Sequence, residues 1–110
     1  MPEVLDAPVV EKTPEKPKPK KQPPYTVIII NDDHHTFDYV VEVMQKVFKL
    51  DRQTAGRYTL RVHNEGRCAV WTGTKELAEL KVEQVKNFGD DPYASVTPKY
   101  SLGCTMEPVA

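Results

Sequence analysis

The hydrophobic residues of this chain occur in short groups, and the spacing of apolar residues differs from one group to the next. The most apolar group, residues 27–30, consists of one valine and three isoleucines that follow Pro24 and Tyr25. A short β-branched run next to a proline is typical of a buried strand rather than a helix. Five polar residues, 31–35, follow it directly, before the next hydrophobic pattern begins. We therefore expect a central strand that ends in a cluster of amide, carboxylate and imidazole groups.

Three later stretches have the period of amphipathic helices. The first begins after Thr36, a good N-cap, and has its apolar residues at Phe37, Val40, Val41, Met44, Val47 and Phe48. The second is expected over residues 52–62, with Asp51 as its cap. The third is expected over residues 75–88 and ends before Gly89. Its predicted sheet-facing residues are Leu77, Ala78, Val82, Val85 and Phe88.

Two further strands complete the predicted fold. Residues 68–71 form a short strand after a turn at residues 64–66, and the alternation over residues 100–106 predicts a half-buried final strand. Residues 90–99 form the loop before it. The order strand, helix, helix, strand, helix, strand predicts an α+β fold, a small sandwich of a three-stranded antiparallel sheet with three helices.

The first 24 residues differ in composition from the rest. They contain seven of the ten prolines, interleaved with lysine and glutamate. Such a segment cannot bury enough apolar surface to offset its ordering entropy. We expect residues 1–24 to be a disordered extension, either a passive tail or an arm that engages a partner, and residues 25–110 to be one domain.

The charge and the cysteine content argue against several classes of protein. The formal net charge of −1 gives no electrostatic reason to expect nucleic acid or a membrane surface as partner. The sequence shows no signal peptide and no apolar stretch of about 18 residues. Its two cysteines are too few for a disulfide framework. A cytoplasmic protein with reduced thiols is the expectation.

The polar cluster at residues 31–35 is the main candidate for chemistry. Carboxylates and imidazoles suit zinc or iron, but adjacent residues cannot all point at one ion, and metal-type histidine spacings are absent. The glycines form no phosphate-binding loop, and no nucleophile stands in a recognisable motif. The sequence therefore predicts no metal and no cofactor.

A cation site makes better physical sense. Asn31 offers an amide oxygen, Asp33 a carboxylate and His63 a nitrogen acceptor if it folds nearby. Four apolar residues are candidates to line a cavity beside them: Ile29, Val40, Val62 and Leu102. Acceptors at the mouth of an apolar hole suit an ammonium group attached to an apolar side chain, as in a free peptide N-terminus.

Several motifs resemble the ClpS family of bacterial Clp protease adaptors. The matching segments are residues 31–33 after the strand, 36–41 opening the first helix, 62–66 at the turn, 78–82 in the third helix and 104–107 in the last strand. The resemblance covers about residues 25–107. It implies an adaptor of the N-degron pathway, without enzymatic activity, that binds substrates with a bulky hydrophobic N-terminal residue and delivers them to a Clp AAA+ unfoldase.

The resemblance also implies roles for individual residues. Asn31, Asp33 and His63 would hold the substrate's α-ammonium group, with Asp32 adding negative potential. Glu76 and Lys81 would dock the N-domain of a ClpA- or ClpC-type unfoldase, and the N-terminal extension would reach toward its pore. The side chain of the first substrate residue would lie against Ile29, His35, Phe37, Val40, Thr59, Val62 and Leu102.

The chain departs from the family pattern at several positions. Family members often have threonine where His35 stands, and methionine where Phe37 and Thr59 stand, which implies a changed pocket. The loop before the last strand is also longer. Two alternatives stay open: a ClpS-like unfoldase regulator with altered or lost N-degron recognition, and a small metal-dependent enzyme around Asp33, His34 and His63.

Overall fold

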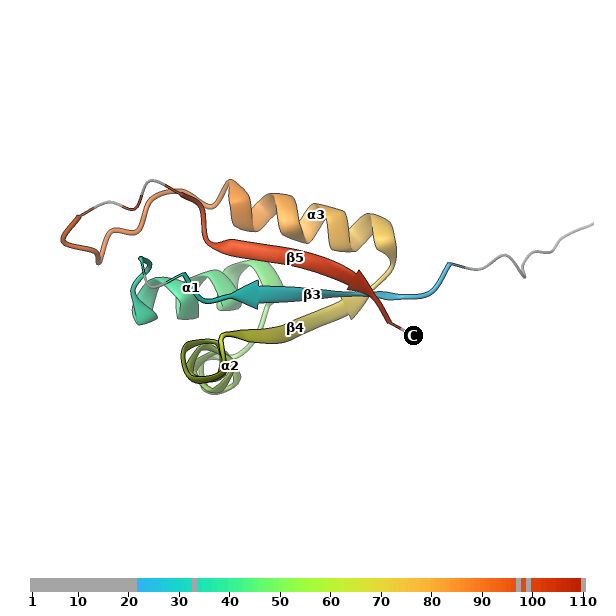
Figure 1. The fold of residues 1–110 in the computed structure, drawn as a ribbon, viewed down its shortest axis with the longest axis horizontal. Coiled ribbons are helices and arrows are strands. Elements are labelled where there is room, and N and C mark those ends of the chain that lie inside the picture. The colour runs from blue at the N-terminus through green and yellow to red at the C-terminus, as the bar shows by residue number, and fades with distance from the viewer. Residues whose placement is uncertain (1–21, 33, 97, 99, 110) are drawn as a thin grey trace, which may run out of the picture.

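The structure, a computed structural model, describes residues 22–109 except Asp33, Thr97 and Lys99. Most of the predicted N-terminal extension, residues 1–21, lies outside the described residues. The elements are β3 (Tyr25–Ile30), α1 (Phe37–Phe48), α2 (Arg52–Glu65), β4 (Arg67–Gly73), α3 (Lys75–Lys86) and β5 (Gly103–Pro108). Their type and order confirm the predicted α+β fold (Figure 1).

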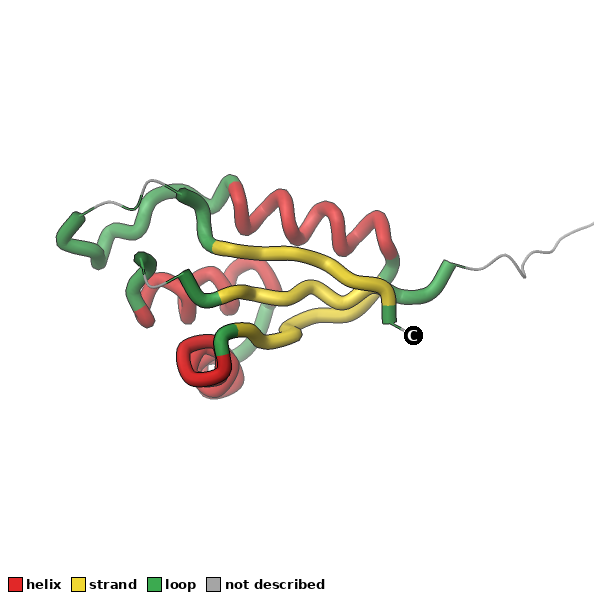
Figure 2. Tube along the Cα trace, in the orientation of Figure 1, coloured by secondary structure: helices red, strands yellow, loops and turns green. Residues whose placement is uncertain are grey.

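The three strands form one antiparallel sheet in the order β4-β3-β5. Figure 2 shows the strands in yellow and the helices, in red, packed alongside them. Val27 and Ile29 of β3 are fully buried and pack with apolar side chains from all three helices. The apolar run that follows Pro24 is therefore the central strand of the sheet, as its composition predicts.

The register of the sheet fixes which segments meet at the end of β3. Ile30 is opposite Arg67 of β4 on one side and Gly103 of β5 on the other. The chain that leaves β3, the end of α2 and the loop before β5 therefore lie at one end of the sheet (Figure 1). Residues 22–24 lie at the opposite end, where β3 begins.

Three helix N-termini are capped by side chains. Thr36 accepts a hydrogen bond from the Tyr39 N–H, Asp51 from the Thr54 N–H, and Thr74 from the Leu77 N–H. These contacts satisfy N–H groups that have no partner within the helix. The predicted caps at Thr36 and Asp51 are confirmed.

Some predicted boundaries are wrong. Helix α2 continues past Val62 to Glu65, so the expected turn is reduced to Gly66. Gly66 adopts φ +92°, a left-handed conformation that ends the helix and that glycine accepts without steric cost. Strand β4 is longer than expected at both ends, α3 ends at Lys86, and β5 starts at Gly103 rather than Tyr100.

One predicted core residue of α3 is exposed. Leu77 is 49% exposed, whereas Ala78 and Val85 are buried. Leu77 lies about 100° around the helix from Ala78, outside the narrow stripe that faces the sheet. Phe37, the first residue of α1, is likewise 45% exposed. Within the described residues, no helix is long and apolar enough to cross a membrane.

Candidate functional site

A backbone hydrogen bond joins the end of β3 to the end of α2. The Asn31 N–H donates to the Gly66 carbonyl at 3.0 Å, and the Gly66 N–H donates to the Val62 carbonyl at 2.9 Å. The last turn of α2, which carries His63, is therefore fastened beside Asn31. His63 is exposed, so its ring is accessible to a ligand. Asp33, the third predicted ammonium-binding residue, lies outside the described residues.

Asp32 organises the turn that follows β3. Its carboxylate accepts hydrogen bonds from the His34 N–H (2.9 Å) and the His35 N–H (3.1 Å), and lies 2.6 Å from the His35 Nδ1. Partial burial raises the pKa of Asp32, but these hydrogen bonds outweigh it, so the net pKa is lowered from its usual value. The site therefore carries a negative charge at neutral pH.

The His35 ring is directed into the protein. Its side chain is 3% exposed, and its ring stacks on Tyr39 with centroids 5.0 Å apart. The Tyr39 hydroxyl donates to the Gly89 carbonyl at 2.6 Å. His35 therefore links the polar turn to α1 and to the segment that leaves α3.

The predicted apolar pocket residues are buried close to one another. Ile29, Val40, Val62 and Leu102 belong to a single hydrophobic cluster. Thr59 is also buried, and its hydroxyl donates to the Ala55 carbonyl at 2.7 Å, so its polar group is satisfied. The apolar candidates thus come together from β3, α1, α2 and the residue before β5, while the pocket itself stays a prediction.

The loop after α3 is anchored to the start of α1 by Asp91. This buried carboxylate accepts hydrogen bonds from the Thr36 N–H (2.7 Å), the Thr36 hydroxyl (3.1 Å) and the Tyr93 N–H (2.9 Å). The sequence did not identify Asp91 as important, because an acidic residue in a proline-containing loop is usually exposed and gives no sign of a contact with Thr36. A cavity of about 160 Å³ lies between this loop, the end of α3 and His35. It is lined by His35, Lys86, Gly89, Asp90, Asp91, Pro98, Tyr100 and Ser101.

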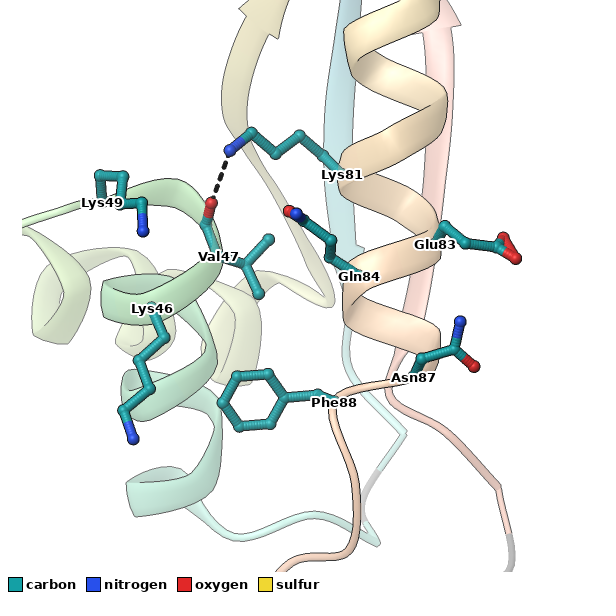
Figure 3. A pocket seen from close by; sticks show the side chains of 8 residues that line it. All are labelled: Lys46, Val47, Lys49, Lys81, Glu83, Gln84, Asn87 and Phe88. Atoms are coloured by element: carbon teal, nitrogen blue, oxygen red, sulfur yellow. Dashed lines mark hydrogen bonds between the residues drawn. The ribbon is translucent and has the colours of Figure 1, made fainter.

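The two predicted docking residues have different surroundings on α3. Glu76 is exposed and borders a hollow of about 780 Å³ that residues 22–24 also line. Lys81 is half-buried, and its ammonium group donates to the Val47 carbonyl of α1 at 2.8 Å. Figure 3 shows Lys81 reaching across a cleft of about 450 Å³ between α3 and the end of α1. Lys81 is therefore held against α1, whereas Glu76 is exposed to solvent.

The described residues give little support to the metal-dependent enzyme. Among them, which do not include Asp33, no three His, Cys, Asp or Glu side chains are grouped to hold a metal ion. Both cysteines are free thiols. Burial raises the pKa of Cys68, and raises that of Cys104 to about 12. Neither thiol is therefore ionised to a useful extent near neutral pH.

Comparison with protein families and solved structures agrees with the motifs. The model of the family described as "ATP-dependent Clp protease adaptor protein ClpS" matches residues 20–95. Proteins named ATP-dependent Clp protease adapter protein ClpS from Burkholderia cenocepacia (strain HI2424) and Burkholderia multivorans (strain ATCC 17616 / 249) are each 41% identical over 85 residues. The match covers 77% of this chain and 80% of each relative.

A solved structure has the same fold. It is described as the structure of Agrobacterium tumefaciens ClpS2 bound to L-phenylalaninamide. The TM-score is 0.69 at 25% sequence identity, and the match covers 81% of this chain and all of the other.

Proposed function

Since the chain belongs to the ClpS family of ATP-dependent Clp protease adaptor proteins, we propose that it is an N-degron adaptor. It binds substrate proteins through a free N-terminal amine and a bulky hydrophobic first side chain. It then delivers them to a Clp AAA+ unfoldase, with no catalytic step and no cofactor of its own. Its compartment is the cytoplasm, where the unfoldase and its protease act.

The observation that carries this proposal is the junction of β3 and α2. The hydrogen bond from Asn31 to Gly66 holds the polar end of the central strand beside the turn of α2 that carries His63. Directly behind that junction, Ile29 and Val62 belong to the apolar cluster. Hydrogen-bond acceptors in front of apolar side chains suit an ammonium group that carries a hydrophobic residue.

The relative from Agrobacterium tumefaciens supports the same ligand chemistry. L-Phenylalaninamide, which that protein binds according to its description, has an amine next to an aromatic side chain. We assign the ammonium group in this chain to Asn31, Asp33 and His63, within the negative potential of Asp32. The first side chain of the substrate lies against the apolar candidates, with His35, Phe37 and Thr59 completing the pocket.

The end of the molecule where β3 begins, opposite the predicted amine site, is suited to binding the unfoldase. Residues 22–24 and Glu76 border the same hollow, so the N-terminal extension leaves the domain next to a predicted docking residue. The predicted amine site is at the other end of β3 (Figure 1). A ClpA- or ClpC-type N-domain bound at Glu76 and Lys81 therefore leaves the substrate site open and receives the extension directly.

The experiment that tests this function is a double-mutant cycle measured by titration. One change acetylates the N-terminus of a peptide that begins with phenylalanine, and the other is Asp33→Ala. Three charge-assisted hydrogen bonds of roughly 1.5–3 kcal/mol each, together with roughly 1.5–3 kcal/mol from burial of the first side chain and offset by the cost of association, suggest an affinity on the order of micromolar for the free amine. Acetylation removes the charge of the amine and leaves Asp33 facing an amide, which should weaken binding by about two orders of magnitude or more.

The cycle has a specific expected form. Asp33→Ala should weaken the free-amine peptide strongly and barely affect the acetylated one, because both changes remove the same interaction. Asp38→Ala, which removes an exposed carboxylate in the first turn of α1, is the matched control and should leave the effect of acetylation intact. Additive losses from acetylation and Asp33→Ala would refute the assignment of Asp33. Equal affinity of wild-type protein for both peptides would favour the regulator that has lost N-degron recognition.

A further inference from the structure

The loop between α3 and β5 approaches the proposed amine site. Because Ile30 is opposite Gly103, the chain that leaves β3 and the chain that enters β5 are adjacent at this end of the sheet. The His34 and Tyr100 rings lie with their centroids 5.8 Å apart and their planes at 50°. Tyr100 therefore stands next to the turn that Asp32 organises.

The start of this loop is held by contacts within the molecule. Asp91 is bound to Thr36 at the start of α1, and the Tyr39 hydroxyl is bound to Gly89. His35 and Tyr100 line the same small cavity under the loop. These contacts hold the start of the loop, and the contact of its ring with His34 holds Tyr100 beside the turn after β3.

Tyr100 is largely exposed to solvent at this place. The residue is 65% exposed, although tyrosine normally buries much of its ring. Leu102, two residues later, is buried among the apolar pocket candidates. Tyr100 thus lies beside the turn after β3 and two residues before a buried pocket candidate.

We propose that Tyr100 contacts the second residue of the bound substrate and selects for an apolar or aromatic side chain there. The proposal rests on the proposed N-degron function, because it needs the substrate amine beside Asn31 and His63. Successive side chains of an extended peptide point to opposite sides, so a first side chain in the core directs the second outward. The ring of Tyr100 is the exposed apolar surface at that position, and it makes the second residue a further determinant of substrate choice.

The test compares two peptides, both with a free amine and phenylalanine first, that have leucine or alanine as the second residue. An apolar contact with an aromatic ring should favour leucine by about 3- to 10-fold on wild-type protein. Tyr100→Ala should reduce this ratio to less than about 2-fold, whereas Tyr100→Phe, which keeps the ring, should preserve it. Val96→Ala removes an apolar side chain that is 80% exposed on the same loop, and it should leave the ratio unchanged.

Titration of the acetylated peptides separates this proposal from the function on which it rests. A leucine preference that Tyr100→Ala does not reduce, with acetylation still weakening binding, would overturn the role of Tyr100 alone. If acetylation has no effect on wild-type binding, the N-degron function and the role of Tyr100 both fail. Because Tyr100 is largely exposed, Tyr100→Ala should unfold at the same urea concentration as wild type.

Discussion

The Asp91 carboxylate and Thr36 are joined by two hydrogen bonds, although 55 positions separate them in the sequence. The Thr36 hydroxyl that donates to Asp91 also accepts the Tyr39 N–H and so caps α1. Asp91 is only 3% exposed. A negative charge beside the N-terminus of a helix is favourable, so one buried carboxylate stabilises both the cap and the loop after α3.

Asp91→Ala should therefore destabilise the domain. Removing the carboxylate leaves the Thr36 N–H and the Tyr93 N–H without this acceptor, and a loss of about 1–3 kcal/mol in the free energy of unfolding is expected. Urea denaturation followed by circular dichroism measures it. Asp90→Ala is the matched control, because Asp90 is exposed and adjacent. Equal midpoints for the two variants would show that the buried contact does not stabilise the fold.

The sequence predicts the parts of this molecule that depend on local patterns. The apolar run at residues 27–30, the cap at Thr36 and the order of elements all follow from residues close together in the chain. The contact between Asp91 and Thr36 depends on how a loop folds back over the domain, and no local signal reports that. Leu77 shows a second limit of sequence-based prediction. The spacing of apolar residues predicts which side of α3 faces the sheet, but it does not show how narrow the buried stripe on that side is.

The candidate site also has features that the sequence predicted and features that it did not. The sequence places Asn31 at the end of a strand, and the apolar candidates at positions that the structure does bury together. It did not reveal that His35 points inward onto Tyr39, because ring stacking depends on tertiary placement. It also placed His63 next to a turn, whereas the residue lies in the last turn of α2.

The contacts of Asp32 predict a dependence of stability on pH. Its folded-state pKa is below the usual value of 3.8, so its stabilising effect is present above that pH and is lost as the pH falls through the folded pKa. The difference in unfolding free energy between wild type and Asp32→Asn should therefore be largest near neutral pH. It should shrink as the pH is lowered below 3.8. Urea titrations across this range measure it, with Asp38→Asn as the exposed control, and a difference that grows in acid would contradict the assignment.

Glu76 and Lys81 should behave differently when their charges are reversed. Glu76→Lys alters an exposed side chain and should leave stability nearly unchanged. Lys81→Glu removes the hydrogen bond to the Val47 carbonyl and should cost about 0.5–1.5 kcal/mol. Both should weaken binding to a purified unfoldase N-domain, while Arg57→Glu on α2 should not. Normal binding by both variants would mean that the docking face lies elsewhere.

Deleting residues 1–21 should separate substrate binding from delivery. The deletion keeps Pro24, whose carbonyl accepts a hydrogen bond from the Val109 N–H at 2.8 Å. Peptide affinity and unfolding free energy should not change, because the proposed amine site is at the other end of β3. Degradation of an N-degron substrate by the unfoldase and its protease should become slower. The same degradation rate with and without these residues would make the extension a passive tail.

The final prediction concerns the size of the proposed pocket. Phe37 is the first residue of α1 and is 45% exposed, at the end of the domain where β3 leaves the sheet. Phe37→Met should therefore have little effect on stability. It replaces a stiff ring with a flexible thioether, which adapts more easily to different side chains. We expect a changed order of affinity among peptides that begin with Phe, Tyr, Trp or Leu, with binding itself retained.

Titration with these four peptides measures the order, and Leu60→Met is the matched control, because Leu60 is 51% exposed on α2. The control should leave the order of the four affinities as it is in wild type. If Phe37→Met also leaves it unchanged, Phe37 does not contact the ligand, and the pocket must be formed by the buried residues alone. If Phe37→Met instead abolishes binding of all four peptides, Phe37 is required to hold the site together. The measured order therefore decides whether a residue at the start of α1 selects the substrate or only supports the site.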